Sequence, residues 1–211
     1  MILASASPRR SELLGELGLS LRVCPADIDE RQLPGEHPQD LVRRLAREKA
    51  RHVHERHGVG EDGFLLAADT IVWMGDEALG KPADETDARA MLRALSGRTH
   101  QVSTGVCLLC QPPGSACLES SFVDTTSVTF HDLTDGQIDA YVSSGECAGK
   151  AGSYAIQGIG RLLVRGIAGD YGNVVGLPTC RVVREMQHLR ERAGIGEDLI
   201  ATMLGGTHGR G

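Results

Sequence analysis

Two arginines stand near the start of this 211-residue chain, in the run Ser7-Pro8-Arg9-Arg10. Ser7 is a good N-cap and Pro8 suits the first position of a helix. Arg9 and Arg10 then fall in the first turn, where the macrodipole already supplies partial positive charge and disfavours cations. Free backbone N–H groups and two guanidinium groups form a cradle that suits a phosphate. Two solvated arginines are the alternative that these residues leave open.

Three further charged residues interrupt apolar patterns. Lys49 continues an apolar row at helical spacing, so it lies on or beside the face that this helix turns to the core. Asp69 directly follows the apolar run 64–68, and chemistry in α/β folds is often placed at the end of a buried strand. Lys81 stands in the turn Gly80-Lys81-Pro82. Each alone fits a structural ion pair, but together with the arginines they indicate an anion site that contains one acid.

This combination of groups suits the hydrolysis of a phosphoanhydride. That reaction needs cations to neutralise oxygens, a divalent metal, and a carboxylate that holds the metal or activates water. A Walker motif is excluded, because Pro82 follows Gly80-Lys81 where Ser or Thr is required. A dinucleotide fingerprint is excluded as well, because Leu163 stands where the third glycine after Gly158 and Gly160 would be.

The composition is that of a globular protein, with 41% hydrophobic and 24% charged residues. The net charge of -6 and the aromatic share of 3% argue against a nucleic-acid partner. An RNA-binding module using the basic helix at 43–56 is therefore a less favoured alternative. No apolar run is long enough for a membrane span and the start is unlike a signal peptide, so we expect no membrane partner and a cytoplasmic location.

The six cysteines are scattered through the chain, and we expect reduced, mostly buried thiols without a structural disulfide. Cys107 and Cys110 form the single C-x-x-C motif. They lie in an apolar run that is typical of a strand, where their odd separation puts the two sulfurs on opposite faces. Because no second ligand pair follows, a zinc site is not expected.

Apolar periodicity predicts an α/β chain in which some strands pair antiparallel. Its length allows one domain or a single fold with two lobes. Strands are predicted at 1–4, 21–24, 64–68, 102–110, 117–130 and 162–167. Helices are predicted at 8–17, at 38–56, from an Asp84 cap to 95, from a capping box at Thr134 and Gln137 to 143, and at 178–192. Residues 205–211 are expected to be a disordered tail.

A series of short motifs follows in order along the chain. They are Leu3-Ala4-Ser5-Ala6-Ser7-Pro8-Arg9-Arg10, Asp29-Glu30, Ala46-Arg47-Glu48-Lys49-Ala50, Ala68-Asp69-Thr70-Ile71-Val72, Gly80-Lys81-Pro82, Leu95-Ser96-Gly97-Arg98-Thr99-His100-Gln101-Val102, Lys150-Ala151-Gly152-Ser153-Tyr154-Ala155-Ile156-Gln157-Gly158 and Val175-Gly176-Leu177-Pro178. With these motifs the chain resembles the Maf family of nucleoside triphosphate pyrophosphatases over nearly its whole length.

The resemblance implies a metal-dependent enzyme that cleaves a nucleoside triphosphate between the α and β phosphates, giving nucleoside monophosphate and pyrophosphate. It implies an elongated mixed α/β sheet with flanking helices, similar to the fold of the inosine triphosphatases, with two lobes around a cleft. One domain over residues 1–204 is expected, together with a homodimer and Mg²⁺ or Mn²⁺ as the cofactor. Removal of non-standard nucleotides is a role that fits this activity.

The resemblance also implies roles for individual residues. Asp69 matches the proton acceptor that activates the attacking water, and Glu30 matches an acidic position that assists metal binding together with Asp69. The positions expected around the triphosphate are Ser7, Arg9, Arg10, Lys49 and Lys81. The positions associated with substrate choice are Arg9, Thr70 and Gln157, and a Gln amide suits this because it both donates and accepts toward a base edge.

Within the family, the segment from Lys150 to Gln157 resembles the branch that acts on dTTP and UTP. Two positions depart from that branch, because Gly149 stands where an acid is usual and Cys147 where a proline is usual. The absence of a carboxylate at position 149 is expected to loosen this loop or to alter the affinity for the metal. A 7-methyl-GTP pyrophosphatase is therefore the alternative enzyme. A nucleotide-binding regulator of cell division with little turnover is the alternative of a different class, although a pure binder needs no acid such as Asp69.

Overall fold

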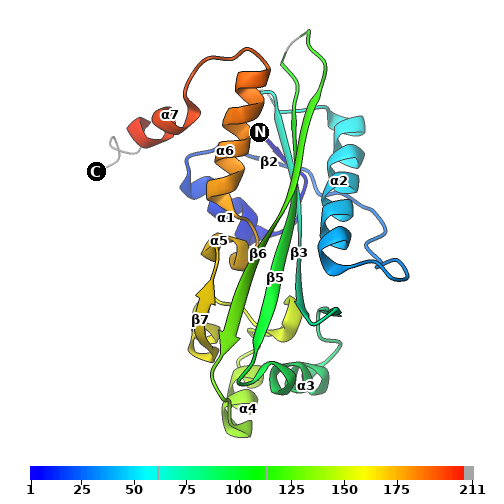
Figure 1. Cartoon of the computed structure of the whole chain (residues 1–211), viewed down its shortest axis with the longest axis vertical. Helices are drawn as coiled ribbons and strands as arrows, with labels where there is room; N and C mark the ends of the chain where they lie inside the picture. Colours follow the sequence, from blue (N-terminus) through cyan, green and yellow to red (C-terminus); the bar gives the residue numbers. More distant parts are fainter. Residues whose placement is uncertain (61, 113, 207–211) are drawn as a thin grey trace.

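The computed structural model of this chain describes residues 1–60, 62–112 and 114–206. Within them, the frame is one seven-stranded mixed sheet with helices on both faces (Figure 1). Across the sheet the order is β2-β1-β3-β5-β6-β7, and β4 lies beside β3. The strands are β1 (Ile2–Leu3), β2 (Arg22–Val23), β3 (Phe64–Met74), β4 (Glu77–Leu79), β5 (Thr99–Cys110), β6 (Leu118–Phe130) and β7 (Val164–Ala168). The predicted mixed α/β class is confirmed.

Three long strands make the molecule elongated. β3, β5 and β6 contain 11, 12 and 13 residues and pair antiparallel as neighbours. β1 is short and pairs in parallel with both β2 and β3. The long strands therefore run through both halves of the molecule, while β1 and β2 extend only one half (Figure 1).

Five of the helices gather at three places around the sheet. α2 covers one face, α1 and α6 lie against the other face, and α3 and α4 close the far end (Figure 1). The helices of the described residues are α1 (Pro8–Glu16), α2 (Pro38–His57), α3 (Glu85–Leu95), α4 (Asp135–Ser143), α5 (Tyr171–Val175), α6 (Thr179–Arg192) and α7 (Leu199–Gly206), with the 3-10 turns η1 (Ala151–Ser153) and η2 (Gly158–Leu163). None of the helices formed by the described residues combines the length and the apolar character that a bilayer crossing needs.

Alternation along β3 decides which side chains meet which helices. Leu65 and Ala67 pack with Ala46 and Ala50 of α2, because successive side chains of a strand point to opposite faces. Leu66 and its even-numbered neighbours pack instead against α1 and α6. The same alternation on β5 places Cys107 in the first of these cores and Cys110 in the second, as predicted. All six cysteines are free thiols.

Most predicted elements form close to their expected bounds, including the Asp84 cap and the capping box of α4. The strand predicted at 64–68 is wrong in length, because β3 continues through Asp69 and Thr70 to Met74. Two polar residues bordering a cavity break the apolar pattern there without breaking the strand. The sequence patterns do not predict α5, α7, β4 or the two 3-10 turns η1 and η2. Of the predicted disordered tail 205–211, the first two residues end α7 and residues 207–211 lie outside the described part.

The core between β5, β6 and η1 contains a buried histidine. His100 meets Phe130 and Tyr154 edge-to-face, with ring centroids 5.0 and 5.4 Å away, and its Nε2 lies 2.8 Å from the Tyr154 hydroxyl. Its Nδ1 has no hydrogen-bond partner among the described residues. Burial lowers the pKa of His100 to about 4, so the ring is neutral at neutral pH.

This shift makes stability depend on pH. The unfolded chain binds a proton at His100 below about pH 6.5, whereas the folded chain does so only near pH 4. Above pH 6.5 the ring is neutral in both states, and His100 does not reduce the free energy of unfolding. As the pH falls, this free energy decreases, by about 3 kcal/mol at pH 4. Urea unfolding of wild type and His100→Gln between pH 7 and pH 4 should show a shallower loss of the unfolding free energy in the variant. Parallel curves would contradict this account.

Candidate active site

A gap in the sheet edge creates the main cavity. β1 pairs with β3 only through Leu65 and Leu66, and β4 begins its pairing at Val72. Within the described chain, no strand therefore pairs with this side of residues 67–71. The segments that leave β1 and β4 surround the gap and line a cavity of about 880 Å³. That volume lies within the range of small-molecule sites.

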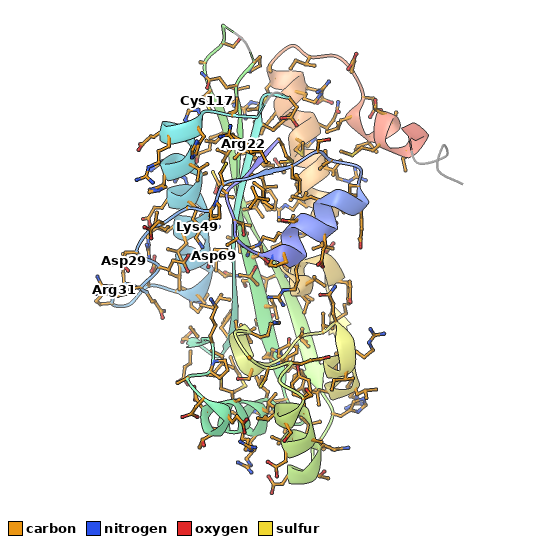
Figure 2. All side chains as sticks on the ribbon, turned by 180° about the vertical axis from the view of Figure 1, so that it is seen from behind. Arg22, Asp29, Arg31, Lys49, Asp69 and Cys117 are labelled. Atoms are coloured by element: carbon orange, nitrogen blue, oxygen red, sulfur yellow. The ribbon has the colours of Figure 1, made fainter. Side chains whose placement is uncertain are left out.

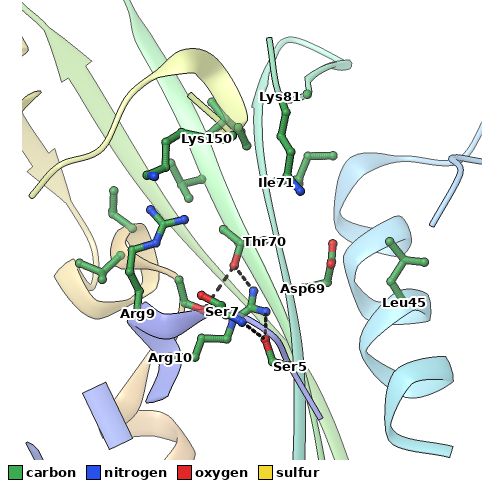
Figure 3. Close-up of a pocket in the computed structure, with 18 of the residues that line it drawn as sticks. Ser5, Ser7, Arg9, Arg10, Leu45, Asp69, Thr70, Ile71, Lys81 and Lys150 are labelled. Carbon is green, nitrogen blue, oxygen red and sulfur yellow. Dashed lines mark hydrogen bonds between the residues drawn. The ribbon is translucent and has the colours of Figure 1, made fainter. Parts of the chain in front are cut away.

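The lining of this cavity is strongly charged. Five cationic side chains line it, against two carboxylates. The cations are Arg9, Arg10, Lys49, Lys81 and Lys150, and the acids are Glu30 and Asp69. In Figure 3, Arg9 and Lys150 lie across the cavity from Asp69. An excess of positive charge in a concave site favours a ligand with several negative charges.

Arg10 is a buried side chain of the cavity wall. It is 8% exposed, and its guanidinium donates to the Gly176 carbonyl, the Ser5 hydroxyl, the Ala68 carbonyl and the Thr70 hydroxyl, each at 2.9 Å. Burial lowers the pKa of Arg10, and the nearby Asp69 carboxylate partly opposes this. Because arginine carries five N–H donors, one remains for a ligand. Neutral protein acceptors, rather than an anion, therefore hold most of this cation at the start of α1.

The first turn of α1 presents its remaining groups to the cavity. Ser7 occupies the N-cap position, but the expected side-chain cap is wrong, since its hydroxyl makes no capping hydrogen bond. Arg9 is half-buried and has no hydrogen bond or ion pair within the described residues. Burial lowers the pKa of Arg9, and the Glu12 carboxylate partly opposes this. Ser7 and Arg9 thus both keep groups that are available to a ligand.

On the α2 side, one lysine joins two acids. The Lys49 ammonium lies 2.6 Å from Asp69 Oδ1 and 2.7 Å from Glu30 Oε1. Lys49 and Asp69 lie close together between α2 and β3 (Figure 2). Their side chains are 9% and 16% exposed, whereas that of Glu30 is 53% exposed. Asp69 reaches Lys49 because it shares the face of β3 that α2 covers, and Thr70 points to the opposite face. Lys49, expected at the triphosphate, is held by carboxylates in this structure.

The close approach of α2 depends on a glycine. Gly105 of β5 lies directly opposite Asp69 in the sheet. A Cβ at this position would clash with the backbone carbonyl of Val42 in α2. The backbone of α2 therefore packs onto the strand with no side chain between them. This packing brings Lys49 within reach of Asp69.

Two lysines enter the cavity from neighbouring loops. Lys81 follows β4 and Lys150 precedes η1, and the Gly152 amide donates to the Gly80 carbonyl at 3.0 Å between these loops. Neither ammonium forms an ion pair with a described residue, and Lys150 makes only a 3.5 Å contact with the Ala148 carbonyl. Lys150 was not among the predicted site residues. Its place in a family motif was the signal that could have identified it.

The structure does not bring Gln157 to the cavity lining. Its neighbour Ile156 lines the cavity, whereas Gln157 is half-buried at the N-cap of η2. The Glu146 carboxylate accepts hydrogen bonds from two backbone amides in the first turn of η2, and so holds this segment in place. Gly149, which replaces the expected acid, lies on the lining with φ +66°. This wall therefore presents no carboxylate to a ligand.

The acid pair fits a divalent cation that also binds the substrate. Among the described residues, no group of three or more His, Cys, Asp or Glu side chains converges on one point. Glu30 and Asp69 supply two carboxylates on one wall. Mg²⁺ is commonly held by one or two carboxylates together with phosphate oxygens and water, and Mn²⁺ prefers similar oxygen ligands.

Comparison with known proteins gives consistent relatives. The profile of a family described as "Maf-like protein" matches residues 1–189. The dTTP/UTP pyrophosphatase of Anaeromyxobacter dehalogenans (strain 2CP-C) is 53% identical over 92% of this chain and 94% of its own length. The protein of the same name from Halalkalibacterium halodurans is 49% identical over 89% of this chain and 94% of its own length. A structure described as a HAM1 protein from Coxiella burnetii overlaps 63% of this chain and 73% of its own, with a TM-score of 0.42 and 20% identity.

The hydrogen bonds of the two arginines predict different costs of substitution. Arg10→Lys cannot restore the planar set of donors, so buried acceptors such as the Ala68 and Gly176 carbonyls lose partners. We expect the unfolding free energy to fall by about 2–4 kcal/mol for Arg10→Lys. The matched Arg9→Lys should change it by less than about 1 kcal/mol. Urea unfolding measures both, and equal effects would contradict the structural role of Arg10.

Proposed function

This chain belongs to the Maf-like protein family, and from that premise we propose that it hydrolyses nucleoside triphosphates, dTTP and UTP foremost, to nucleoside monophosphate and pyrophosphate. One observation carries the proposal. Arg9, Lys81 and Lys150 bring three cations without an ion pair to any described residue into one cavity, which the carboxylates of Asp69 and Glu30 also line. Relatives about half identical in sequence bear the name dTTP/UTP pyrophosphatase.

The cationic wall suits the triphosphate. The Arg9 guanidinium can grip phosphate oxygens with two parallel hydrogen bonds, and the lysines add mobile point charges. The start of α1 contributes backbone N–H groups that the Ser7 side chain leaves uncapped. These groups stabilise negative charge that moves onto the phosphate oxygens as the bridge breaks. The same wall thus serves binding and the departure of pyrophosphate.

The acidic wall suits the activation of water. Lys49 holds Asp69 Oδ1, and Oδ2 accepts no hydrogen bond from a described residue. A water beside Oδ2 can give its proton to the carboxylate while its oxygen bonds to phosphorus. The phosphorus attacked is that of the α-phosphate. Its bond to the α–β bridging oxygen breaks, and pyrophosphate leaves with the electron pair. Asp69 then carries the proton until solvent removes it.

The remaining assignments are also proposals. Mg²⁺ or Mn²⁺, held by Glu30 and Asp69, would neutralise phosphate oxygens when bound. Thr70 bonds to Arg10 and shares a hydrogen bond with Thr104, so we assign it to the shape of the wall beside the substrate. Base selection by Arg9 and Gln157 stays a prediction, as do the homodimer and the cytoplasmic location.

Product analysis across a nucleotide panel tests the reaction and the substrate together. With Mg²⁺ or Mn²⁺, we expect pyrophosphate release from dTTP and UTP to exceed that from the other canonical triphosphates and from 7-methyl-GTP by at least about tenfold. Reactions without metal serve as the control. Faster turnover of 7-methyl-GTP would identify the alternative substrate. Tight dTTP binding without turnover of any nucleotide would favour a regulator.

Removal of the proposed base should separate catalysis from binding. Asp69→Asn should reduce pyrophosphate release at least about 100-fold, because the amide cannot take the proton of water. The affinity for dTTP, measured by calorimetry, should stay within about tenfold, since the base acts mainly on the transition state. Asp76→Asn is the matched control, because Asp76 is an exposed side chain outside the cavity lining. Near wild-type turnover of Asp69→Asn would remove it from this role.

A further inference from the structure

Lys49 differs from the other cations of the cavity in its partners. Arg10 bonds to neutral groups, and Arg9, Lys81 and Lys150 have no ion pair within the described chain. Lys49 alone in this lining binds acids, and it binds both of them, at 2.6 and 2.7 Å. Its ammonium therefore occupies the space between the two carboxylates that suit a divalent cation.

We propose that Lys49 acts as an internal competitor for the metal, so that the divalent cation binds weakly to the free enzyme and enters with the triphosphate. The inference rests on the proposed function. A metal held by Glu30 and Asp69 shares these carboxylates with the ammonium, which already contacts one oxygen of each, and two positive charges a few ångströms apart repel. The metal therefore binds the two carboxylates more tightly once Lys49 has moved away from them.

The triphosphate offers Lys49 new anionic partners in place of the carboxylates. The lysine sits on a flexible four-carbon stem rooted in α2, and its ammonium can exchange a carboxylate for a phosphate oxygen without losing an anionic partner. Nucleotide binding thus frees the acids at the moment when the metal arrives. Asp69 is fixed on β3, while Glu30 lies on the exposed connection before α2 and can follow the metal.

The neighbouring acid does not relieve this competition. Asp29 precedes Glu30 but bonds to Arg31, with the Arg31 Nη2 2.6 Å from Asp29 Oδ2 (Figure 2). The Asp29 side chain is not part of the cavity lining. The metal therefore has the same two carboxylates as Lys49 and no third one within this lining.

Binding of Mn²⁺ to the nucleotide-free protein tests the proposal directly. The electron paramagnetic resonance signal of free Mn²⁺ gives the dissociation constant for wild type, Lys49→Met and Lys150→Met. We expect Lys49→Met to bind Mn²⁺ at least about tenfold more tightly than wild type, as like-charge repulsion is removed at the carboxylates. Lys150→Met deletes the same charge from the same cavity without touching an acid, and should stay within about threefold.

Two further proteins keep the test decisive. The double variant Lys49→Met with Asp69→Asn should lose the gain, which locates the tighter binding at this acid pair. If Lys49→Met does not fold, Lys49→Gln provides the same comparison, because it also removes the charge. Mn²⁺ should then raise the melting temperature of the uncharged variant but not that of wild type.

The result that overturns the proposal is Mn²⁺ binding by Lys49→Met or Lys49→Gln that is no tighter than that of Lys150→Met. Lys49 would then serve the phosphates or the fold alone. These readouts use no nucleotide and no turnover. Failure of the proposed reaction, seen as absence of pyrophosphate, is therefore distinguishable from failure of this inference.

Discussion

One buried guanidinium holds together the parts that surround the cavity. Arg10 ties the start of α1 to Ser5 after β1, to the open edge of β3 at Ala68, and to Gly176 before α6. An unpaired strand edge needs donors for its carbonyls, and Arg10 supplies one where no strand can. The side of β3 that lacks a neighbouring strand is thereby able to face a ligand. Arg9, the residue before Arg10, points into the cavity that results (Figure 3).

The two faces of a single strand divide the chemistry. Asp69 turns toward α2 and meets Lys49, which also binds Glu30, while Thr70 turns toward α1 and meets Arg10. The period of two along a strand thus separates a wall suited to proton transfer and metal binding from a wall suited to phosphate. Gly105 permits the arrangement, because any side chain there would hold α2 away from the sheet. Few residues are needed to create two electrostatic environments in one cavity.

Sequence patterns predicted the elements whose burial is regular, such as α2, α3, β5 and β6. They failed in β3, where polar residues interrupt the apolar run because they border a cavity rather than because the strand ends. The sequence predicted which charged residues gather at the cavity, but not their hydrogen-bond partners. Arg10 bonds to groups 58 and 166 residues away in the chain, and the Ser7 side chain does not cap its own helix. Lys150 was missed, although it begins one of the family motifs. The roles inferred for Gln157 and Glu30 stay predictions.

The continuity of β3, β5 and β6 has a mechanical consequence. A hinge between the two halves would have to distort the hydrogen-bonded ladders that run through both, so the sheet resists bending beside the cavity. Access must instead come from segments outside the ladders, which carry Glu30, Lys81 and Lys150. The hydrogen bond from the Gly152 amide to the Gly80 carbonyl links the two lysine segments to each other. We therefore expect ligand entry to depend on movement of a few loop residues rather than on movement of whole lobes.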